Sequence, residues 1–122
     1  MSQYEIAVAR YFEAWNATGG DALAKAVAAA WSEDGYFTDP LSRARGHADV
    51  AAVIAGVHEQ FPGFELRRTG GVDGHHDTAR FSWELVSPAD GSAPVAGFDV
   101  ITLAEDGRIR SVLGFLDRVP TA

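Results

Sequence analysis

The side chain whose chemistry the sequence constrains most is the carboxyl group of Asp99. It interrupts an apolar segment, residues 94–103, in which Phe98, Val100 and Ile101 are its near neighbours. Removing an unpaired carboxylate from water is costly, so this group must be ion-paired, hydrogen-bonded or kept protonated by a raised pKa. A carboxyl that stays protonated can donate a hydrogen bond or a proton to a ligand, whereas a paired one is structural. Both interpretations of Asp99 stay open at this point.

Thiol chemistry is absent from this chain, and metal chemistry is not expected. There is no cysteine, hence no thiol nucleophile, thiolate ligand or disulfide. Two of the four histidines, His75 and His76, are adjacent in an expected hairpin turn. Side chains of adjacent residues point apart on a strand, so a metal ion shared by this pair would need further ligands. We therefore expect neither a metal nor another cofactor.

Three segments in the first half have the apolar spacing of amphipathic helices. Ser2 and Glu5 form a capping-box pair before the first, whose apolar face includes Tyr11 and Trp15. Asp21 is the expected N-cap of the second. The first helix is expected to stop at Gly19-Gly20, and the second to run through Trp31 and stop at Gly35. A strand over residues 36–39, ended by Pro40, follows. The third helix is expected from about His47 to Gln60.

The second half has the pattern of β-strands joined by short turns. Consecutive strands with short turns favour an antiparallel meander. Helices that come first and strands that come last favour an α+β fold, with the helices packed on one face of a curved sheet. Gly70-Gly71 is expected to form a bulge that lets the sheet bend. The expected strands are residues 64–73, 78–86, 94–103 and 109–117.

The two turns that flank the strand carrying Asp99 allow its register to be estimated. Pairing residue 86 with residue 94, and residue 103 with residue 109, places Asp99 opposite Phe81 on one side and opposite Leu113 on the other. Directly opposed residues share a face, and this face is the more apolar, so the helices should cover it and bury Asp99. The same face then also carries Trp83, Leu85, Ile101, Leu103, Ile109, Phe115 and Asp117.

Arg68 could decide the ionisation state of Asp99. If residue 73 pairs with residue 78 across the preceding turn, Arg68 faces Trp83 on the covered side of the sheet. A guanidinium group beside Asp99 would keep the carboxyl ionised and end its use as a hydrogen-bond donor.

The opposite face of the sheet is too apolar for a surface that is fully wetted. Burial against a second subunit would explain this, and we expect a homodimer formed through the outer face. The apolar residues expected there are Phe98, Val100, Val112 and Leu116.

Length and charge exclude several classes of protein. The 122 residues suit one domain, residues 1–122, and no apolar run is long enough for a membrane helix. The net charge of −7, without a basic stripe, makes nucleic acid and anionic membranes poor partners. The first residues lack the basic and apolar regions of a secretory signal, so we expect a cytoplasmic protein.

Four segments together resemble the nuclear transport factor 2-like superfamily, in particular its SnoaL-like and ketosteroid-isomerase-like branch. The resemblance extends over about residues 4–118. It implies a cystatin-like α+β barrel: a cone-shaped, curved antiparallel sheet wrapped by three N-terminal helices around a deep apolar pocket, commonly in a dimer. The segments are Asp34 to Pro40 (DGYFTDP), Arg45 to Val50 (RGHADV), Gly97 to Val100 (GFDV) and Gly114 to Asp117 (GFLD).

The resemblance also implies roles for individual residues. Ketosteroid isomerases use an Asp after the second helix as the general base, and a Tyr and a protonated Asp as donors to the oxyanion. Matched by position, these residues are Asp39, Tyr11 and Asp99. Asp39, which precedes Pro40, is equally suited to closing a turn. A flat apolar ligand would contact aromatic side chains that could also be core: Trp15, Trp31, Phe61, Trp83 and Phe115.

The superfamily hosts several chemistries, and the sequence separates some of them. Epoxide hydrolases of this fold place an Arg two residues before the late-strand Asp, where this chain has Gly97. A dehydratase would need a pocket histidine, for which His58 is a candidate. The favoured hypothesis is an acid–base enzyme, an isomerase, cyclase or dehydratase, acting on a small apolar ligand with a carbonyl group. The alternatives are a non-catalytic small-molecule-binding or dimerisation domain and a purely structural subunit.

Overall fold

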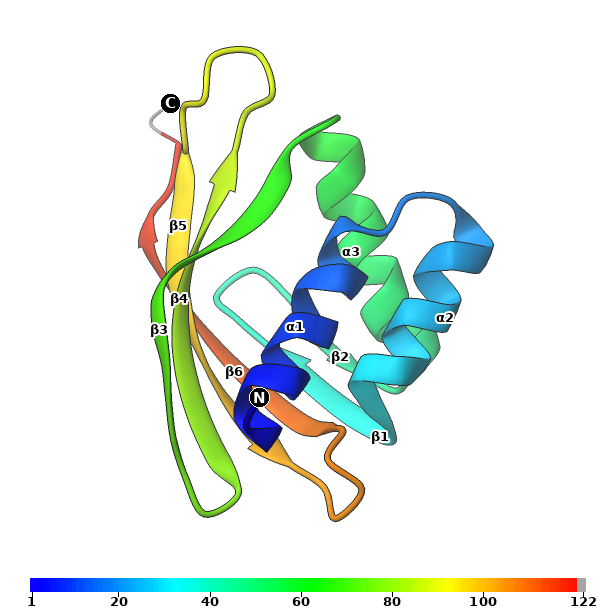
Figure 1. Cartoon of the computed structure of the whole chain (residues 1–122). Helices are drawn as coiled ribbons and strands as arrows, with labels where there is room; N and C mark the ends of the chain where they lie inside the picture. Colours follow the sequence, from blue (N-terminus) through cyan, green and yellow to red (C-terminus); the bar gives the residue numbers. More distant parts are fainter. Residues whose placement is uncertain (121–122) are drawn as a thin grey trace.

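The computed structural model describes residues 1–120 as three helices and a six-stranded sheet. The helices lie on one face of a strongly curved, unclosed sheet, which confirms the α+β fold (Figure 1). No helix in this range is long and apolar enough to span a membrane. The elements are α1 (Gln3–Asn16), α2 (Gly20–Ala30), β1 (Trp31–Thr38), β2 (Arg43–Arg45), α3 (His47–Gln60), β3 (Glu65–His75), β4 (Thr78–Val86), β5 (Val95–Leu103) and β6 (Ile109–Arg118).

The first and third helices begin where the sequence predicts. The hydroxyl of Ser2 accepts a hydrogen bond from the backbone N–H of Glu5 at 3.1 Å, and the Glu5 carboxylate accepts one from the Ser2 N–H at 3.3 Å. This reciprocal pair is the predicted capping box. The third helix covers His47–Gln60, as expected.

The junction between α2 and β1 differs from the prediction. Gly19, with a φ of 91°, is the N-cap of α2, and Asp21 lies in the first turn instead of capping it. The helix ends at Ala30, so Trp31 is the first residue of β1. Gly35 does not stop an element; it lies inside β1, where a Cβ atom would approach Trp31 Cδ1 to 2.6 Å. A glycine in this strand therefore reflects close packing, which local sequence patterns do not distinguish from a stop.

The sheet is mixed, with the strand order β2-β1-β6-β5-β4-β3. Strands β3 to β6 form the expected antiparallel meander, and β2 forms an antiparallel pair with β1. The pair β1 and β6 is parallel, which the prediction of an antiparallel sheet missed. Strand β1 enters the sheet beside the last strand of the chain, so no short turn reports this pairing in the sequence.

One of the two predicted registers around Asp99 is correct and the other is wrong. On β4, Phe81 lies opposite Asp99, as expected. On β6, Ile109 pairs with Leu103 as expected, but an irregularity follows and brings Gly114, not Leu113, opposite Asp99. The extra residue in β6 exchanges its two faces beyond that point. The residues moved to the covered side are Val112 and Leu116, and those moved outward are Leu113 and Phe115. Asp117 falls at a second irregularity, between the pairs Gly97–Leu116 and Ala96–Arg118.

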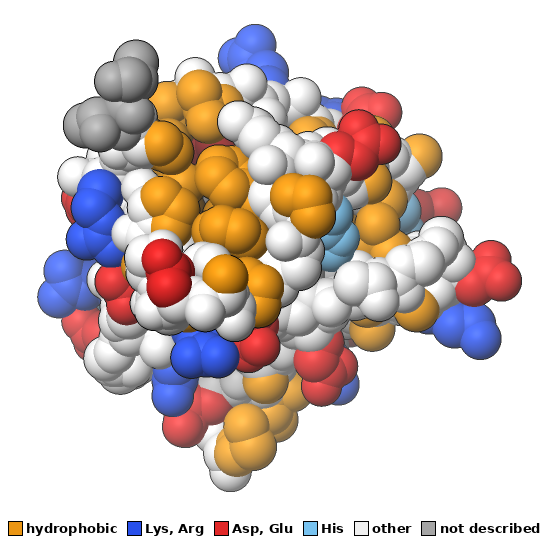
Figure 2. Space-filling model, turned by 90° about the horizontal axis from the view of Figure 1, so that it is seen from above, with side chains coloured by type: hydrophobic (Ala, Val, Ile, Leu, Met, Phe, Trp, Pro, Cys, Tyr) orange, Lys and Arg blue, Asp and Glu red, His pale blue; other side chains and the backbone are white. Residues whose placement is uncertain are grey.

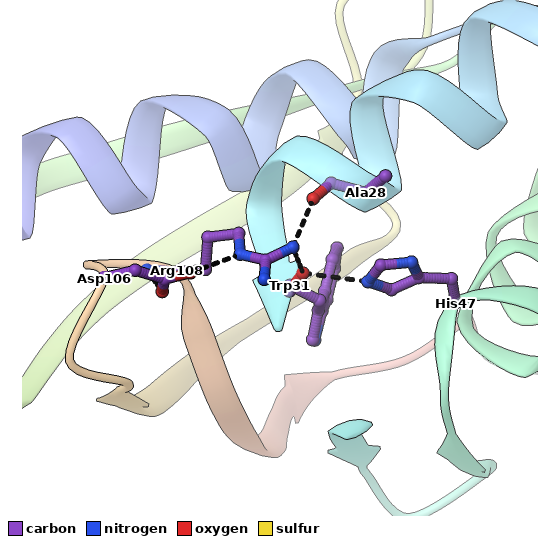
Figure 3. A network of polar contacts seen from close by, with 5 residues as sticks. All are labelled: Ala28, Trp31, His47, Asp106 and Arg108. Atoms are coloured by element: carbon purple, nitrogen blue, oxygen red, sulfur yellow. Dashed lines mark hydrogen bonds and ion pairs between the residues drawn. The ribbon is translucent and has the colours of Figure 1, made fainter. Parts of the chain in front are cut away.

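A polar cluster ties the end of α2 to two other parts of the molecule (Figure 3). Arg108, in the turn between β5 and β6, donates hydrogen bonds to the backbone oxygens of Ala28 and Trp31 and forms an ion pair with Asp106. His47 Nε2 at the start of α3 lies 2.8 Å from the same Trp31 oxygen. The cluster fixes the point at which the chain passes from the helical layer into the sheet.

Candidate functional site

A cavity of about 280 Å³ lies between the helices and the covered face of the sheet. Seen from above, hydrophobic side chains gather around a hollow at this end of the molecule (Figure 2). Four other hollows in the described part of the chain open more widely to solvent, and none of them brings two carboxyl groups together. The residues that line the cavity are Tyr11, Trp15, Phe37, Asp39, Leu41, Val57, Gln60, Phe61, Leu66, Trp83, Leu85, Val95, Asp99, Phe115, Leu116, Val119 and Pro120.

Tyr11 and Asp99 form a buried hydrogen bond in the wall of this cavity. The hydroxyl of Tyr11, on the apolar face of α1, donates to Asp99 Oδ2, in the middle of β5, at 2.7 Å. Each residue is only 2% exposed. The sequence required Asp99 to be paired, hydrogen-bonded or protonated, and the structure supplies the hydrogen bond across 88 residues of chain.

Burial dominates the protonation of this pair. Removal from water raises the pKa of Asp99 to about 7; the hydrogen bond from Tyr11 and the nearby indole of Trp83 oppose the rise, and the charge of Asp39 adds to it. Burial, followed by the charge of Asp99, raises the pKa of Tyr11 well above its usual range. Tyr11 therefore keeps its proton at neutral pH, and Asp99 keeps its own to a higher pH than an exposed carboxyl group does.

Asp39 stands at the end of β1 and reaches the same cavity. Its Oδ1 accepts hydrogen bonds from the backbone N–H groups of Leu41 at 2.9 Å and Ser42 at 2.8 Å. Oδ1 of Asp39 therefore closes the turn, as one interpretation of this residue expected. The same residue also lines the cavity. The two backbone bonds fix the orientation of the carboxyl group.

Gly114 of β6 lies between the two carboxyl groups. It pairs with Asp99 of β5, and its neighbour Leu113 pairs with Thr38 at the end of β1. A Cβ atom at Gly114 would lie 2.8 Å from Asp99 Oδ1 and 3.3 Å from Asp39 Cβ. The absence of a side chain here lets both acids approach the same point.

Arg68 does not bind Asp99. It lies opposite Trp83, as predicted. The turn pairs His75, not residue 73, with Thr78, and the bulge at the expected glycines shifts the register back so that Arg68 still meets Trp83. The Arg68 side chain is exposed, and its charge contributes to lowering the pKa of Glu5, while it is not among the groups that shift the pKa of Asp99. The hypothesis that this cation keeps Asp99 ionised is therefore wrong.

Four of the five predicted ligand-contacting aromatic residues line the cavity: Trp15, Phe61, Trp83 and Phe115. The prediction for Trp31 is wrong, because this side chain is fully buried behind the cavity wall, with its ring centroid 5.4 Å from that of Tyr11. Phe115 borders the cavity, but its ring stacks on Phe98 of the outer face at 5.0 Å, as the register shift in β6 requires.

Some lining residues were missed by the sequence analysis. Phe37 is two residues before Asp39, so strand alternation could have indicated that it faces the same side. Leu116 was assigned to the outer face because of the wrong register. Leu41, which is 79% exposed at the cavity, lies in a turn where no periodicity exists to reveal it.

Histidine and glycine positions bear on the alternative chemistries. His58 is absent from the cavity lining and its Nε2 lies 2.6 Å from the backbone oxygen of Trp15. At Gly97, a Cβ atom would lie 2.8 Å from Trp83 Cζ2 and still closer to the backbone oxygen of Phe115, so the arginine of the epoxide hydrolase pattern has no room. No group of three or more potential metal-ligating side chains occurs within residues 1–120.

Comparisons with known proteins agree with the fold. The family model of the SnoaL-like domain matches residues 8–112. The crystal structure of a proposed isomerase of the SnoaL-like family from Agrobacterium tumefaciens superimposes on this chain with a TM-score of 0.89. The two sequences are 38% identical, and the match covers 96% of this chain and 99% of the other.

Two more distant structures show the fold alone. A proposed SnoaL-like polyketide cyclase from Jannaschia is 22% identical, with 94% and 85% of the two chains covered and a TM-score of 0.74. A proposed polyketide cyclase from Sinorhizobium meliloti is 17% identical, with 93% and 99% covered and a TM-score of 0.70. The comparison with curated proteins finds no match.

Proposed function

The chain belongs to the SnoaL-like domain family, and from this premise we propose that it is a cofactor-independent acid–base enzyme for a small, apolar ligand with a carbonyl group. The observation that carries the proposal is the buried Tyr11–Asp99 hydrogen bond in a cavity that Asp39 also lines. Two carboxyl groups in unlike surroundings suit the two halves of a proton transfer, because a base must be ionised and an oxyanion donor must hold its proton.

The arrangement gives each residue a distinct role. Asp39 takes a proton from the carbon next to the carbonyl group. Asp99 in its protonated form donates a hydrogen bond to the carbonyl oxygen, where negative charge develops. Because Asp99 Oδ2 already accepts from Tyr11, the proton of the neutral acid is left to Oδ1, the oxygen beside Gly114 and Asp39. Tyr11 is thus a positioning residue that orients the acid.

The lining of the cavity favours a neutral ligand. It is mainly apolar and includes two acids, while no Lys, Arg or His lines it among the residues that the structure describes. An anionic substrate would therefore meet repulsion without a counter-charge. The volume of about 280 Å³ is at the low end for small-molecule sites, which favours a compact substrate.

Proton exchange tests the proposal directly. The wild-type protein should speed the exchange of α-hydrogens for deuterium in a panel of neutral cyclic ketones, followed by NMR. Asp39→Asn and Asp99→Asn should each slow this exchange by about 10²-fold or more. Asp117→Asn, a change at an exposed acid that does not line the cavity, is the control and should leave the rate unchanged. Equal rates in all four proteins would exclude the mechanism.

A non-catalytic binding domain is the second candidate. It is favoured by the role of Asp39 in its own turn, since the bonds to Leu41 and Ser42 give this carboxyl a structural purpose. In that case ligands would bind in the cavity without exchange, and Asp39→Asn would weaken the fold but not alter any rate. Binding without exchange across the ketone panel would support this candidate over the enzyme.

A further inference from the structure

Buried indole N–H groups without a hydrogen-bond partner are an unexpected feature of this chain. Within residues 1–120 they belong to Trp15, Trp31 and Trp83. Leaving a buried donor unpaired costs stability, and native proteins rarely keep one without a reason. Two of the three, Trp15 and Trp83, line the cavity that contains the Tyr11–Asp99 pair.

Trp83 is held beside the carboxyl group of Asp99. It lies on the covered face of β4, two residues after Phe81, which is directly opposite Asp99. Its ring packs against Gly97, where the missing side chain leaves room for it. The indole lowers the pKa of Asp99, although its N–H makes no bond of normal length and angle with any described residue. The indole N–H of Trp83 therefore influences the charge of the Asp99 carboxyl group without forming a hydrogen bond to it.

Trp15 has the same relation to Tyr11. It is one helical turn further along α1, and the two ring centroids are 6.3 Å apart. Trp15 is 8% exposed, and its indole lowers the pKa of Tyr11. The ring of Trp31 also packs against that of Tyr11, but Trp31 does not contribute to the pKa shift of either Tyr11 or Asp99. Trp31 is therefore a natural control.

We propose that Trp15 and Trp83 are positioning residues whose indole N–H groups are spare hydrogen-bond donors for negative charge on the Tyr11–Asp99 pair. The donors are unpaired while Asp99 is neutral. When Asp99 loses its proton, to water or to a ligand oxygen, the Trp83 N–H closes on the carboxylate. The Trp15 N–H closes on the Tyr11 oxygen, whose own proton is drawn toward Asp99.

The charges around the pair leave this task to the indoles. The titratable groups that act on Asp99 are Tyr11 from α1 and Asp39 from the end of β1, and the charge of Asp39 raises its pKa further. From the neighbouring strands it meets Phe81 and Gly114, which carry no charge. With no cation in the described lining, the neutral donors that can stabilise the ionised form are the Tyr11 hydroxyl, which is already bonded, and the indole N–H groups.

NMR on the intact, ¹⁵N-labelled chain tests this inference without a ligand. The three tryptophans give three indole signals, which Trp→Phe variants assign. The pH is varied around 7 and then taken further, if needed, until the ¹³C-labelled carboxyl of Asp99 has changed state. The indole protons of Trp15 and Trp83 should move downfield with the midpoint of Asp99, and that of Trp31 should not. In Asp99→Asn, all three signals should stay in place.

Two outcomes would overturn the inference. One is a titration of Asp99 that leaves the Trp15 and Trp83 signals unmoved, and the other is a shift of the same size at Trp31. The variants provide a second measurement: Trp83→Phe should raise the pKa of Asp99, and Trp31→Phe should not. Equal changes in both would assign the effect to burial alone.

The inference deepens the proposed function but fails separately from it. It rests on that function only for its effect on the reaction rate, because simple titration also charges the pair. A chain that exchanges no ketone hydrogens could still show the indole shifts. A chain that exchanges them without indole shifts would keep the enzyme hypothesis and lose this one.

Discussion

At the scale of single residues, the protonation of Asp99 connects stability with chemistry. The carboxyl is almost completely buried and accepts a hydrogen bond from Tyr11, with a second acid, Asp39, nearby. Such an acid is destabilising when ionised and compatible with its surroundings when neutral. The property that would make it a useful hydrogen-bond donor therefore also makes folding depend on pH.

The free energy of unfolding should fall as the pH rises from 3.8 to about 7. In this window the unfolded chain releases the proton of Asp99 while the folded chain keeps it. The contribution of neutral Asp99 to stability is therefore complete at pH values below the window and is lost as the pH rises through its upper end. The loss should be on the order of a few kcal/mol. Urea unfolding at a series of pH values measures it. Asp99→Asn should remove this slope, and an identical slope in the variant would assign it to other groups.

A second residue-scale prediction concerns the close packing at Gly97. A Cβ atom there meets Trp83 and the backbone of Phe115, so Gly97→Ala should destabilise the fold by roughly 1–3 kcal/mol. Gly71→Ala is the matched control, because a Cβ atom there has no neighbour within 4 Å. Thermal or urea unfolding compares the two variants. A similar small effect in both would mean that β5 and β6 shift to accept the methyl group.

At the scale of elements, the junction of α2 and β1 depends on a side chain from a distant turn. Arg108 donates hydrogen bonds to the backbone oxygens of Ala28, in the last turn of α2, and of Trp31, at the start of β1. His47 contacts the same Trp31 oxygen (Figure 3). Because Asp39 directly follows the far end of β1, this junction helps to set the position of the candidate base.

Removing the charge of Arg108 should therefore weaken the fold. Arg108→Met keeps the aliphatic stem but leaves the oxygens of Ala28 and Trp31 with fewer donors, and should cost about 1–3 kcal/mol in urea unfolding. Arg80→Met is the control, because its ion pair with Asp73 is exposed and should contribute less than about 1 kcal/mol. Equal effects would mean that the cluster adds nothing beyond a surface ion pair.

At the scale of the whole molecule, the outer face of the sheet carries an apolar patch beside ion-paired residues such as Arg80 and Glu84, and the residues of the patch differ from those expected. Phe98 and Phe115 stack on it, and Leu113 and Phe115 are 40% and 50% exposed. Val112 and Leu116, assigned to this face from the sequence, lie on the covered side. The homodimer through the outer face therefore stays a prediction, now made with a corrected set of residues.

Light scattering at micromolar concentration should give twice the chain mass of 13.0 kDa. Phe115→Glu should convert the protein to monomers, since the charge would be buried against the second copy. Leu41→Glu places the same charge on an exposed residue at the cavity and should leave the mass unchanged. A wild-type mass of 13.0 kDa would contradict the dimer.

What the sequence determined by itself was mostly local. The capping box, the third helix and the four C-terminal strands follow from patterns within a few residues. Pairing residue 86 with residue 94 across the connection after β4 was enough to place Phe81 opposite Asp99. The burial of Asp99 followed from that pairing, while the matching of Tyr11 and Asp39 to it came from the resemblance to a family.

The tertiary structure alone decided how distant segments meet. One extra residue in β6 exchanged its faces, the parallel pairing of β1 with β6 brought Asp39 to Gly114, and Arg68 stayed away from the site. Local periodicity reports which face of an element is apolar. It does not report which element covers that face or in which register, because those depend on packing between residues far apart in the chain.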